Sequence, residues 1–346
     1  MKTYNLLFCI LATVLLACNS EDIVCETTKP DPDPQGICDT GLLIMRSDGD
    51  TGEPRFSLDS LSKPINTPLV FQNIRHDQQD DTQFDVFNRP SNYDGFNANT
   101  GQYFIEFPLQ QRLYVYDVSA QSRQELIVAG FYSAPIFSNN NLYAVTIDNF
   151  GYATNPANYS IETINLNDGS LTTIITNSFP LLSSFDWESM SSATDGNGML
   201  YFVSGTNLVI FNTATSTTNA VELVPDFNTT TNFQRFYGLE YRNTGNLLAI
   251  RERDNNQGEG LEIVSIDPNN PTTAPTVIFD FMANGINLNS EFYATSYDDC
   301  DDTYYITSRD NNNIDITNFY EINLFDNTVK TESFNFYLMG ISTKNN

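Results

Sequence analysis

Residues 319–334 read FYEINLFDNTVKTESF, and this stretch indicates the fold class. An apolar strand runs into a turn at Asp326 and Asn327, and a second strand with period-two alternation follows. Asp and Asn favour tight turns, and alternation at every second position is typical of a β-strand with one buried face. The stretch therefore predicts a β-hairpin. The same pattern recurs at 113–128, 159–175, 208–224 and 261–279, with a less regular copy at 55–71.

A second hairpin precedes most of these copies. Residues 131–145 read FYSAPIFSNNNLYAV, with three asparagines at the turn. Comparable hairpins occupy 187–203, 236–250 and 292–306. The two hairpins together make a unit of four short strands that repeats at a spacing of roughly 45 to 60 residues. No long helical pattern interrupts the repeat, so the chain is predicted to be all-β.

This repeat resembles the four-stranded blade of a β-propeller, in which each sheet packs its faces against the neighbouring sheets. The copy at 55–71 lacks a preceding hairpin, whereas the strand at 336–342 lacks a partner. We therefore expect this C-terminal strand to be the innermost strand of the first blade, whose other strands begin at Leu42. The result is a six-bladed β-propeller closed by its C-terminal strand. The Trp-Asp and Gly-His pairs of WD repeats are absent from the sequence, so no named repeat family follows. A pair of β-sandwiches or a seven-bladed ring are the alternatives.

The N-terminal residues have the parts of an export signal. Lys2 precedes an apolar run over residues 6–17, which is shorter than the about 20 residues that a membrane-spanning helix needs. Residues 15–18 read LLAC, which resembles the lipobox of bacterial lipoproteins and implies cleavage before Cys18 and acylation of its thiol. An ordinary secretory signal with a chance cysteine is the alternative. We expect residues 1–17 to be a signal peptide, residues 18–37 an acidic, Pro-rich tether, and residues 38–346 the propeller.

The location of the mature chain follows from the residues after Cys18. Ser20-Glu21-Asp22 resembles the acidic signal that sends lipoproteins of Bacteroidota to the cell surface, with a generic acidic linker as the alternative. We expect a protein held by lipid in the outer membrane and exposed outside the cell. The formal net charge of -27 would repel phosphate backbones, so nucleic acid is excluded as an expected partner.

The cysteines left after removal of the signal fit an oxidising compartment. Cys25, Cys38 and Cys300 follow the lipidated cysteine, and three cannot all pair. Cys38 lies just before the first blade and Cys300 in the first turn of the sixth, and these blades are neighbours in a six-bladed ring. We predict a Cys38–Cys300 disulfide that closes the ring, with Cys25–Cys38 as the rival pairing.

The search for catalytic chemistry gives few candidates. His76 is the single histidine, and it lies in a polar stretch that favours a solvated loop over a catalytic triad. The sequence contains no Cys-x-x-Cys pair, no phosphate-binding Gly-x-x-x-x-Gly-Lys motif and no His-Glu-x-x-His motif. Calcium is the possible cofactor, since hard cations prefer carboxylate and amide oxygens. A weak candidate loop places Asp48, Asp50 and Glu53 at nearly alternate positions, and an ordinary turn is the alternative.

The innermost strand of the fourth blade is expected to start with Asp186-Trp187-Glu188-Ser189, which holds the single tryptophan between two carboxylates. Six-bladed lactonases resembling gluconolactonase hold a calcium ion at the channel mouth with Glu, Asn and Asp. This resemblance implies that Glu188, Glu240 and Asn97 occupy such places, although Trp187 packed between blades and Asp186 capping a turn explain the same residues.

Two functions remain open on this basis. The first is a non-catalytic surface module that binds a glycan, a protein or an envelope partner. The second is a calcium-dependent lactonase- or esterase-like hydrolase at the channel mouth. We favour the first, because it explains the lipid tether and the lack of an acid-base histidine without requiring carboxylates to converge on a cation.

Overall fold

The computed structural model describes residues 41–47, 55–62, 68–78, 94–107, 111–130, 132–147, 158–178, 190–223, 234–253, 260–288, 292–310, 313 and 316–344. All of them belong to one compact unit, Cys38–Asn346. They form six four-stranded antiparallel sheets, each a blade of a β-propeller. The prediction of a six-bladed propeller is therefore confirmed. No helix long and apolar enough to cross a membrane occurs among the described residues.

The blades are numbered in chain order, and their strands are given from the innermost to the outermost. Blade 1 contains β24 (Tyr337–Thr343), β1 (Gly41–Ser47), β2 (Arg55–Ser62) and β3 (Gln72–Gln78). Blade 2 contains β4 (Asp94–Asn97), β5 (Gln102–Phe107), β6 (Arg112–Asp117) and β7 (Ser122–Ile127). Blade 3 contains β8 (Tyr132–Ser138), β9 (Asn141–Ile147), β10 (Asn158–Ile164) and β11 (Leu171–Ser178).

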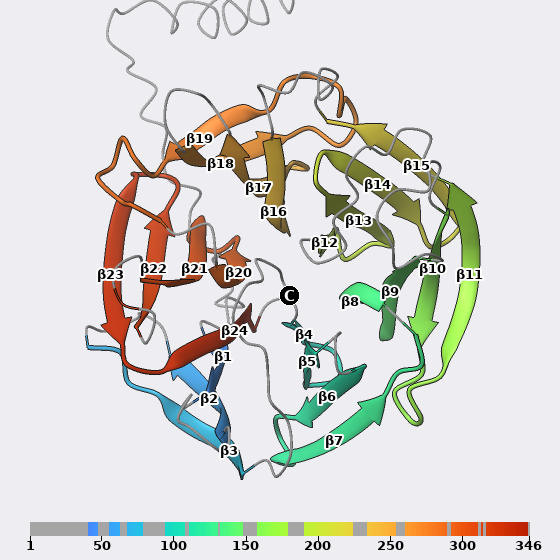
Figure 1. Cartoon of the computed structure of the whole chain (residues 1–346), viewed down its shortest axis with the longest axis horizontal. Coiled ribbons are helices and arrows are strands. Elements are labelled where there is room, and N and C mark those ends of the chain that lie inside the picture. The colour runs from blue at the N-terminus through green and yellow to red at the C-terminus, as the bar shows by residue number, and fades with distance from the viewer. Residues whose placement is uncertain are drawn as a thin grey trace, which may run out of the picture. The chain divides into compact units, whose positions relative to one another are not determined.

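The second half of the ring has the same plan. Blade 4 contains β12 (Ser191–Thr194), β13 (Met199–Ser204), β14 (Asn207–Asn212) and β15 (Thr217–Glu222). Blade 5 contains β16 (Gln234–Tyr241), β17 (Leu247–Arg253), β18 (Gly260–Ile266) and β19 (Thr276–Asp280). Blade 6 contains β20 (Phe292–Asp298), β21 (Thr303–Arg309), β22 (Thr317–Asn323) and β23 (Thr328–Phe334). Figure 1 shows the first strand of each blade beside the central axis and the fourth strand at the rim.

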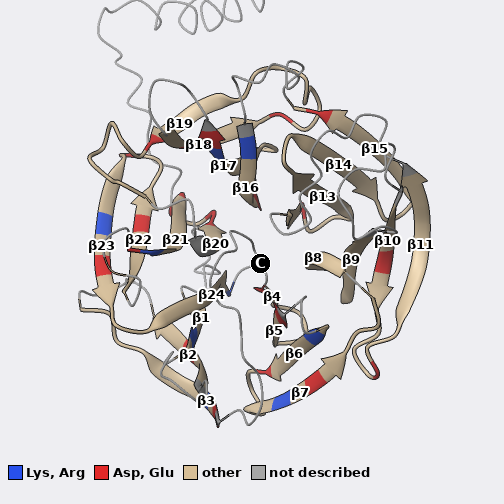
Figure 2. Cartoon of the chain, viewed as in Figure 1, with Lys and Arg blue, Asp and Glu red and all other residues tan. Residues whose placement is uncertain are grey.

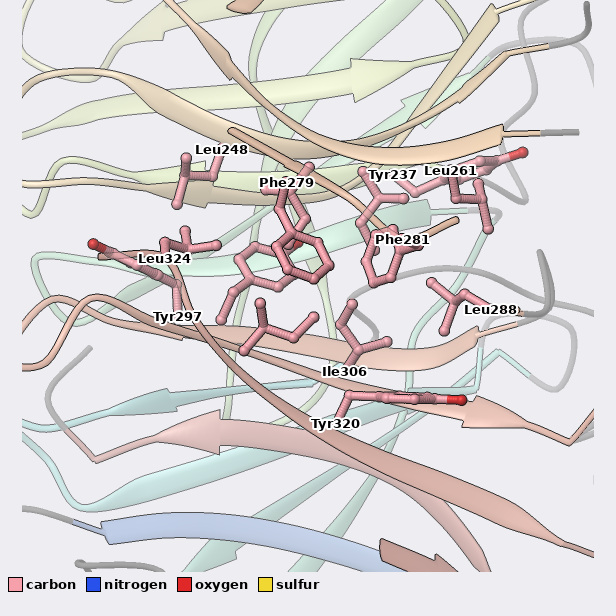
Figure 3. Packing of buried hydrophobic residues seen from close by; sticks show 14 residues of the cluster. Tyr237, Leu248, Leu261, Phe279, Phe281, Leu288, Tyr297, Ile306, Tyr320 and Leu324 are labelled. Atoms are coloured by element: carbon pink, nitrogen blue, oxygen red, sulfur yellow. The ribbon is translucent and has the colours of Figure 1, made fainter. Parts of the chain in front are cut away.

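The core consists of six apolar clusters, one between each pair of adjacent blades. The strand β1 shows how the sequence builds them. Successive side chains of a strand point to opposite faces, so Leu42 and Ile44 pack against blade 6 while Leu43 and Met45 pack against blade 2. A strand buried on both faces is therefore continuously apolar. Figure 3 shows the cluster between blades 5 and 6, where Tyr237 and Phe279 face Tyr297 and Ile306.

The outermost strands have one solvated face, and most of them carry charged side chains. Both β7 and β23 carry an acidic and a basic residue (Figure 2). Lys330 on β23 forms a salt bridge with Glu321 on β22 at 3.1 Å, and Glu125 on β7 forms one with Arg112 on β6. Such exposed pairs contribute little to stability, at roughly 0 to 1 kcal/mol each.

The C-terminal strand closes the ring as predicted, because β24 pairs with β1 from Leu42–Thr343 to Ser47–Tyr337. The end of β24 also contacts blade 6. The Thr343 amide donates to Ser296 Oγ at 3.0 Å, and the Thr343 hydroxyl donates to the Tyr297 carbonyl at 3.3 Å. This seam therefore joins blade 1 to blade 6 through hydrogen bonds as well as through apolar packing.

One strand of blade 1 differs from the expectation. Its fourth strand was expected to end at Phe71, but β3 begins only at Gln72. Pro68 cannot donate a hydrogen bond to a sheet. Leu69 and Phe71 instead pack against the cluster between blades 6 and 1, where the Phe71 ring lies 5.4 Å from that of Phe334. Leu69 and Phe71 belong to the interface between blades and not to a sheet.

Candidate functional site

The six inner strands surround a cavity of about 270 Å³. Each of these strands contributes a polar side chain from its last residue or from one of the two residues before it. In the order of the ring these residues are Asn97, Ser138, Thr194, Glu240, Ser296 and Ser342. Because each sits on a strand that is hydrogen-bonded to the rest of its blade, the six side chains are held in fixed positions. We call this set the polar ring.

Asp94, the first residue of β4, also lines the cavity. It is only 8% exposed. The hydroxyls of Tyr103 and Ser342 both donate to its Oδ2, at 2.9 and 3.0 Å. Its other oxygen, Oδ1, is buried and has no hydrogen-bond partner in the described part of the chain. A buried polar atom without a partner is rare in a native protein and calls for an explanation, such as an ordered water, an ion, a catalytic role or a bound polar group.

Burial raises the pKa of Asp94 to about 8, because the charged carboxylate loses its hydration. Hydrogen bonds from Tyr103 and Ser342 favour the charged form but do not cancel this effect. The Asp94 carboxyl is therefore mostly protonated at neutral pH. Since Oδ2 already accepts two hydrogen bonds, the proton is best placed on Oδ1.

Gly340 on β24 makes the room for this arrangement. A Cβ atom at Gly340 would lie 3.0 Å from Asp94 Cγ and would overlap the Tyr103 hydroxyl. A similar close approach occurs between blades 5 and 6, where the Tyr304 hydroxyl donates to the Gly238 carbonyl. In both places a tyrosine on the second strand of one blade reaches a glycine on the inner strand of the preceding blade.

Two further polar groups of the cavity bear on its chemistry. Ser138 is 4% exposed, and its hydroxyl is another buried polar atom without a partner among the described residues. Glu240 is 8% exposed and accepts a hydrogen bond from the Thr295 hydroxyl at 3.3 Å. Asp94 and Glu240 are acidic, and no Lys, Arg or His occurs among the described residues that line the cavity.

Part of the cavity wall is aromatic, formed by Phe96, Phe104, Phe137 and Tyr241. The rings of Phe104 and Phe137 meet edge to face with centroids 5.3 Å apart. Tyr241 stacks on Tyr201 with an interplanar angle of 12°. The cavity thus combines hydroxyl, amide and carboxyl groups with aromatic rings, which is typical of sites for small polar organic ligands.

The structure places two of the residues singled out from the sequence on this cavity. Asn97 and Glu240 both belong to the polar ring, at the ends of β4 and β16. Asn97 Nδ2 donates to Asn140 Oδ1 at 3.5 Å. The other candidates lie outside the described residues: Asp186, Trp187 and Glu188 of the expected channel mouth, Asp48, Asp50 and Glu53 of the expected calcium loop, and Cys18 of the lipobox. No group of three or more His, Cys, Asp or Glu side chains suited to a metal ion occurs among the described residues.

The sequence analysis missed Asp94, Tyr103 and Ser138. Asp94 stands in SNYDGFNANT, a stretch over residues 91–100 whose composition is that of a loop. Its one local signal is Gly95, where a Cβ would lie 2.7 Å from the Phe104 ring. Ser138 precedes the three asparagines of the turn in blade 3. The asparagines predict the turn, but nothing near Ser138 in the sequence indicates that it lines a cavity.

His76 lies on β3 and not in a loop, so that expectation was wrong. The side chain is exposed, and its Nδ1 lies 2.6 Å from Ser57 Oγ on β2. The neighbouring Asp77 forms a salt bridge with Arg75 at 2.7 Å. Because adjacent residues of a strand point to opposite faces, Asp77 does not orient the imidazole, and no Ser-His-Asp triad forms here.

Cys300, in the turn between β20 and β21, is in a disulfide bond. All other cysteines of the chain lie outside the described residues, so its pairing with Cys38 stays a prediction. The seam geometry supports that pairing. The Lys344 amide donates to the Gly41 carbonyl at 3.1 Å, next to the contacts of Thr343 with blade 6. Cys38 stands three residues before Gly41, which is a reach of about 10 Å.

No family model and no curated protein matches the sequence. Among solved structures, the chain is similar to an oligogalacturonate lyase in complex with manganese, at 10% identity over 80% of this chain and 73% of that chain, with a TM-score of 0.43. It is similar to an oligogalacturonate lyase from Vibrio parahaemolyticus at 9% identity over 84% and 78%, with a TM-score of 0.43. It is also similar to the β-propeller domain of Cps50 (Swd1) from Myceliophteria thermophila at 8% identity over 82% of both chains, with a TM-score of 0.44. Likenesses this distant say nothing about the chemistry of the cavity.

Proposed function

We propose that this chain is a non-catalytic binding module whose central cavity receives the polar end of an extracellular or envelope partner. The observation that carries the proposal is the pair of buried polar atoms, Asp94 Oδ1 and Ser138 Oγ, that line one cavity without partners among the described residues. Leaving such atoms unsatisfied costs roughly 1 to 3 kcal/mol each, and a bound polar group would remove that cost. The polar ring supplies further donors and acceptors on rigid strands.

Attachment to the outer membrane through Cys18, with display at the cell surface, is part of the same proposal. Its support is the LLAC sequence at 15–18 and the acidic residues that follow it. A lipid-held ring that presents a cavity suits capture of a glycan or protein from outside. The strong negative charge suits partners that are neutral or basic.

Blocking the cavity tests this function. Ala98, in the exposed turn between β4 and β5, lines the cavity, so Ala98→Trp should obstruct it without disturbing the core. Ala120→Trp, in the exposed turn between β6 and β7, is the matched control. Binding of the purified full chain to arrays of glycans and envelope polymers should fall at least tenfold for Ala98→Trp and stay unchanged for Ala120→Trp. Equal binding by both variants would place the binding surface elsewhere.

A calcium-dependent hydrolase is the second candidate, and Asp94 is the observation that favours it. A carboxyl that keeps its proton at neutral pH can act as a general acid, and Glu240 lines the same cavity. Turnover of lactone, ester or glycoside substrates that disappears in Asp94→Asn would move this candidate to first place.

A further inference from the structure

The residues that line the cavity indicate which chemical group of the partner it binds. This inference rests on the proposed binding function. The buried Asp94 Oδ1 and Ser138 Oγ require hydrogen-bond partners that the described chain does not supply. The Asp94 carboxyl holds a proton in the empty cavity, but once it gives up that proton beside a cation its Oδ1 becomes an acceptor, and a serine hydroxyl can accept as well as donate. A ligand group rich in donors would satisfy both.

The charge of the cavity favours a cationic donor. Two carboxyl groups, Asp94 and Glu240, line the cavity, and none of its described lining residues is basic. The surrounding molecule is also strongly acidic, at -27. A cation would relieve the burial that disfavours the Asp94 carboxylate, whereas an anion would meet repulsion from Glu240.

The walls favour an organic cation over a metal ion. Phe96, Phe104, Phe137 and Tyr241 line the cavity, and aromatic faces attract organic ammonium groups. A calcium ion takes about six to eight oxygen ligands, several of them carboxylates. No described cluster of three His, Cys, Asp or Glu side chains could hold such an ion. An ammonium group needs only one acceptor for each N–H bond.

The hydroxyls of the polar ring indicate what the ammonium group is attached to. The Ser342 and Thr295 hydroxyls donate to Asp94 and Glu240, and Ser296, Asn97 and Thr194 line the same cavity. Hydroxyl and amide side chains of this kind pair with the hydroxyls of a sugar. We propose that the cavity binds the primary ammonium group of an amino sugar, with the Asp94 carboxyl as its acceptor, the Ser138 hydroxyl as a further polar contact, and Glu240 adding negative charge from the opposite side of the cavity.

Matched sugars test this proposal directly. Isothermal titration of the purified full chain with glucosamine and with glucose, which carries a hydroxyl in place of the ammonium group, isolates the contribution of the charge. Glucosamine should bind at least tenfold more tightly than glucose. Asp94→Asn and Glu240→Gln should each weaken glucosamine binding at least tenfold, whereas Asp117→Asn, at the end of β6 and away from the cavity lining, should not change it. A thermal melt of each variant verifies that it is folded.

A second readout distinguishes a direct role of Asp94 from a structural one. An ammonium group beside Asp94 favours its carboxylate, so binding at pH 7 should release about one proton. Titration in two buffers of different ionisation enthalpy measures that proton, and Asp94→Asn should abolish its release. Tyr103, the other titratable group in contact with Asp94, has a pKa raised well above its usual value by burial and stays neutral.

The remaining outcomes separate this proposal from the proposed function. Equal binding of glucose and glucosamine, lost in Ala98→Trp, would overturn the ammonium specificity and leave the binding function standing. Equal binding of glycinamide would overturn the amino sugar and indicate a peptide amine. Glucosamine binding that survives Ala98→Trp would show that the sugar binds outside this cavity. No glucosamine binding at all would overturn the amino sugar as its ligand.

Discussion

Replacing Asp94 with asparagine should change how the stability of the protein depends on pH. Burial raises the pKa of Asp94 to about 8, whereas a carboxyl in an unfolded chain has a pKa of about 3.9. The folded protein therefore holds a proton that the unfolded chain gives up. The resulting stability is fully present below about pH 4 and is lost as the pH rises through about 8. Between the two pKa values the free energy of unfolding falls by about 1.4 kcal/mol per pH unit. This group alone therefore lowers it by about 3 kcal/mol from pH 5 to pH 7.

Asparagine has no proton to lose, and its carbonyl oxygen can still accept from Tyr103 and Ser342. We expect urea unfolding at pH 5, 6 and 7 to show a difference that grows with pH. The free energy of unfolding of Asp94→Asn, relative to that of the wild type, should rise by about 3 kcal/mol from pH 5 to pH 7. Asp117→Asn is the control. Hydrogen bonds from Ala120 and Ser119 lower the pKa of Asp117. The titration of this carboxyl therefore changes the stability of the protein only at pH values below about 4. Parallel stability curves for the wild type and Asp94→Asn would refute the assignment of a buried, protonated carboxyl.

Four further predictions address the packing, the seam, the anchor and the metal. Gly340→Ala should lower the free energy of unfolding by roughly 1 to 3 kcal/mol, because its Cβ would press on Asp94. The control is Gly260→Ala, where no atom lies within 4 Å of the added Cβ, and denaturant unfolding of this variant should show almost no change. Peptide mapping of the unreduced protein should yield a Cys38–Cys300 peptide, a bond that the chain-entropy model values at roughly 5 to 6 kcal/mol for so long a loop, and a Cys25–Cys38 peptide would contradict it. Cys18→Ser should move the protein from the membrane to the soluble fraction, and retention in the membrane would contradict lipid anchoring. A chelator should shift the melting temperature only slightly, whereas a large drop restored by calcium and abolished by Glu188→Gln would favour the hydrolase.

The fold could be predicted because the propeller repeats its pattern within short stretches of sequence. Hairpins such as 319–334 show both the apolar strands and the Asp or Asn turn, and the structure places β22 and β23 there. The closing strand could be predicted because one strand at the C-terminus had no local partner. The fourth strand of blade 1 could not, because Leu69 and Phe71 have the pattern of a strand but pack against another blade.

Most of the cavity could not be predicted, because its chemistry depends on residues far apart in the chain. Asp94 stands in a polar stretch, and nothing near it in sequence indicates that its carboxyl is buried. Its burial comes from Gly340 and Ser342, almost 250 residues away, and from Tyr103 on the neighbouring strand. Asn97 and Glu240 were singled out through the resemblance to six-bladed lactonases, which hold a calcium ion at the channel mouth with residues of these types, and this needs no knowledge of distant contacts.

The seam and the cavity depend on the same strand, and this couples stability to binding. On β24, Gly340 and Ser342 contact Asp94 of blade 2, while Thr343 bonds to blade 6. Release of β24 would remove Ser342 from Asp94, whereas Tyr103 would stay beside Asp94 in blade 2, and it would take away one wall of the cavity. A ligand that binds only the closed cavity therefore stabilises the closed seam. The free energy of opening rises by RT ln(1 + [L]/Kd), which is about 2.7 kcal/mol when the ligand concentration is a hundred times Kd. The proposed Cys38–Cys300 disulfide would hold the same seam when no ligand is bound.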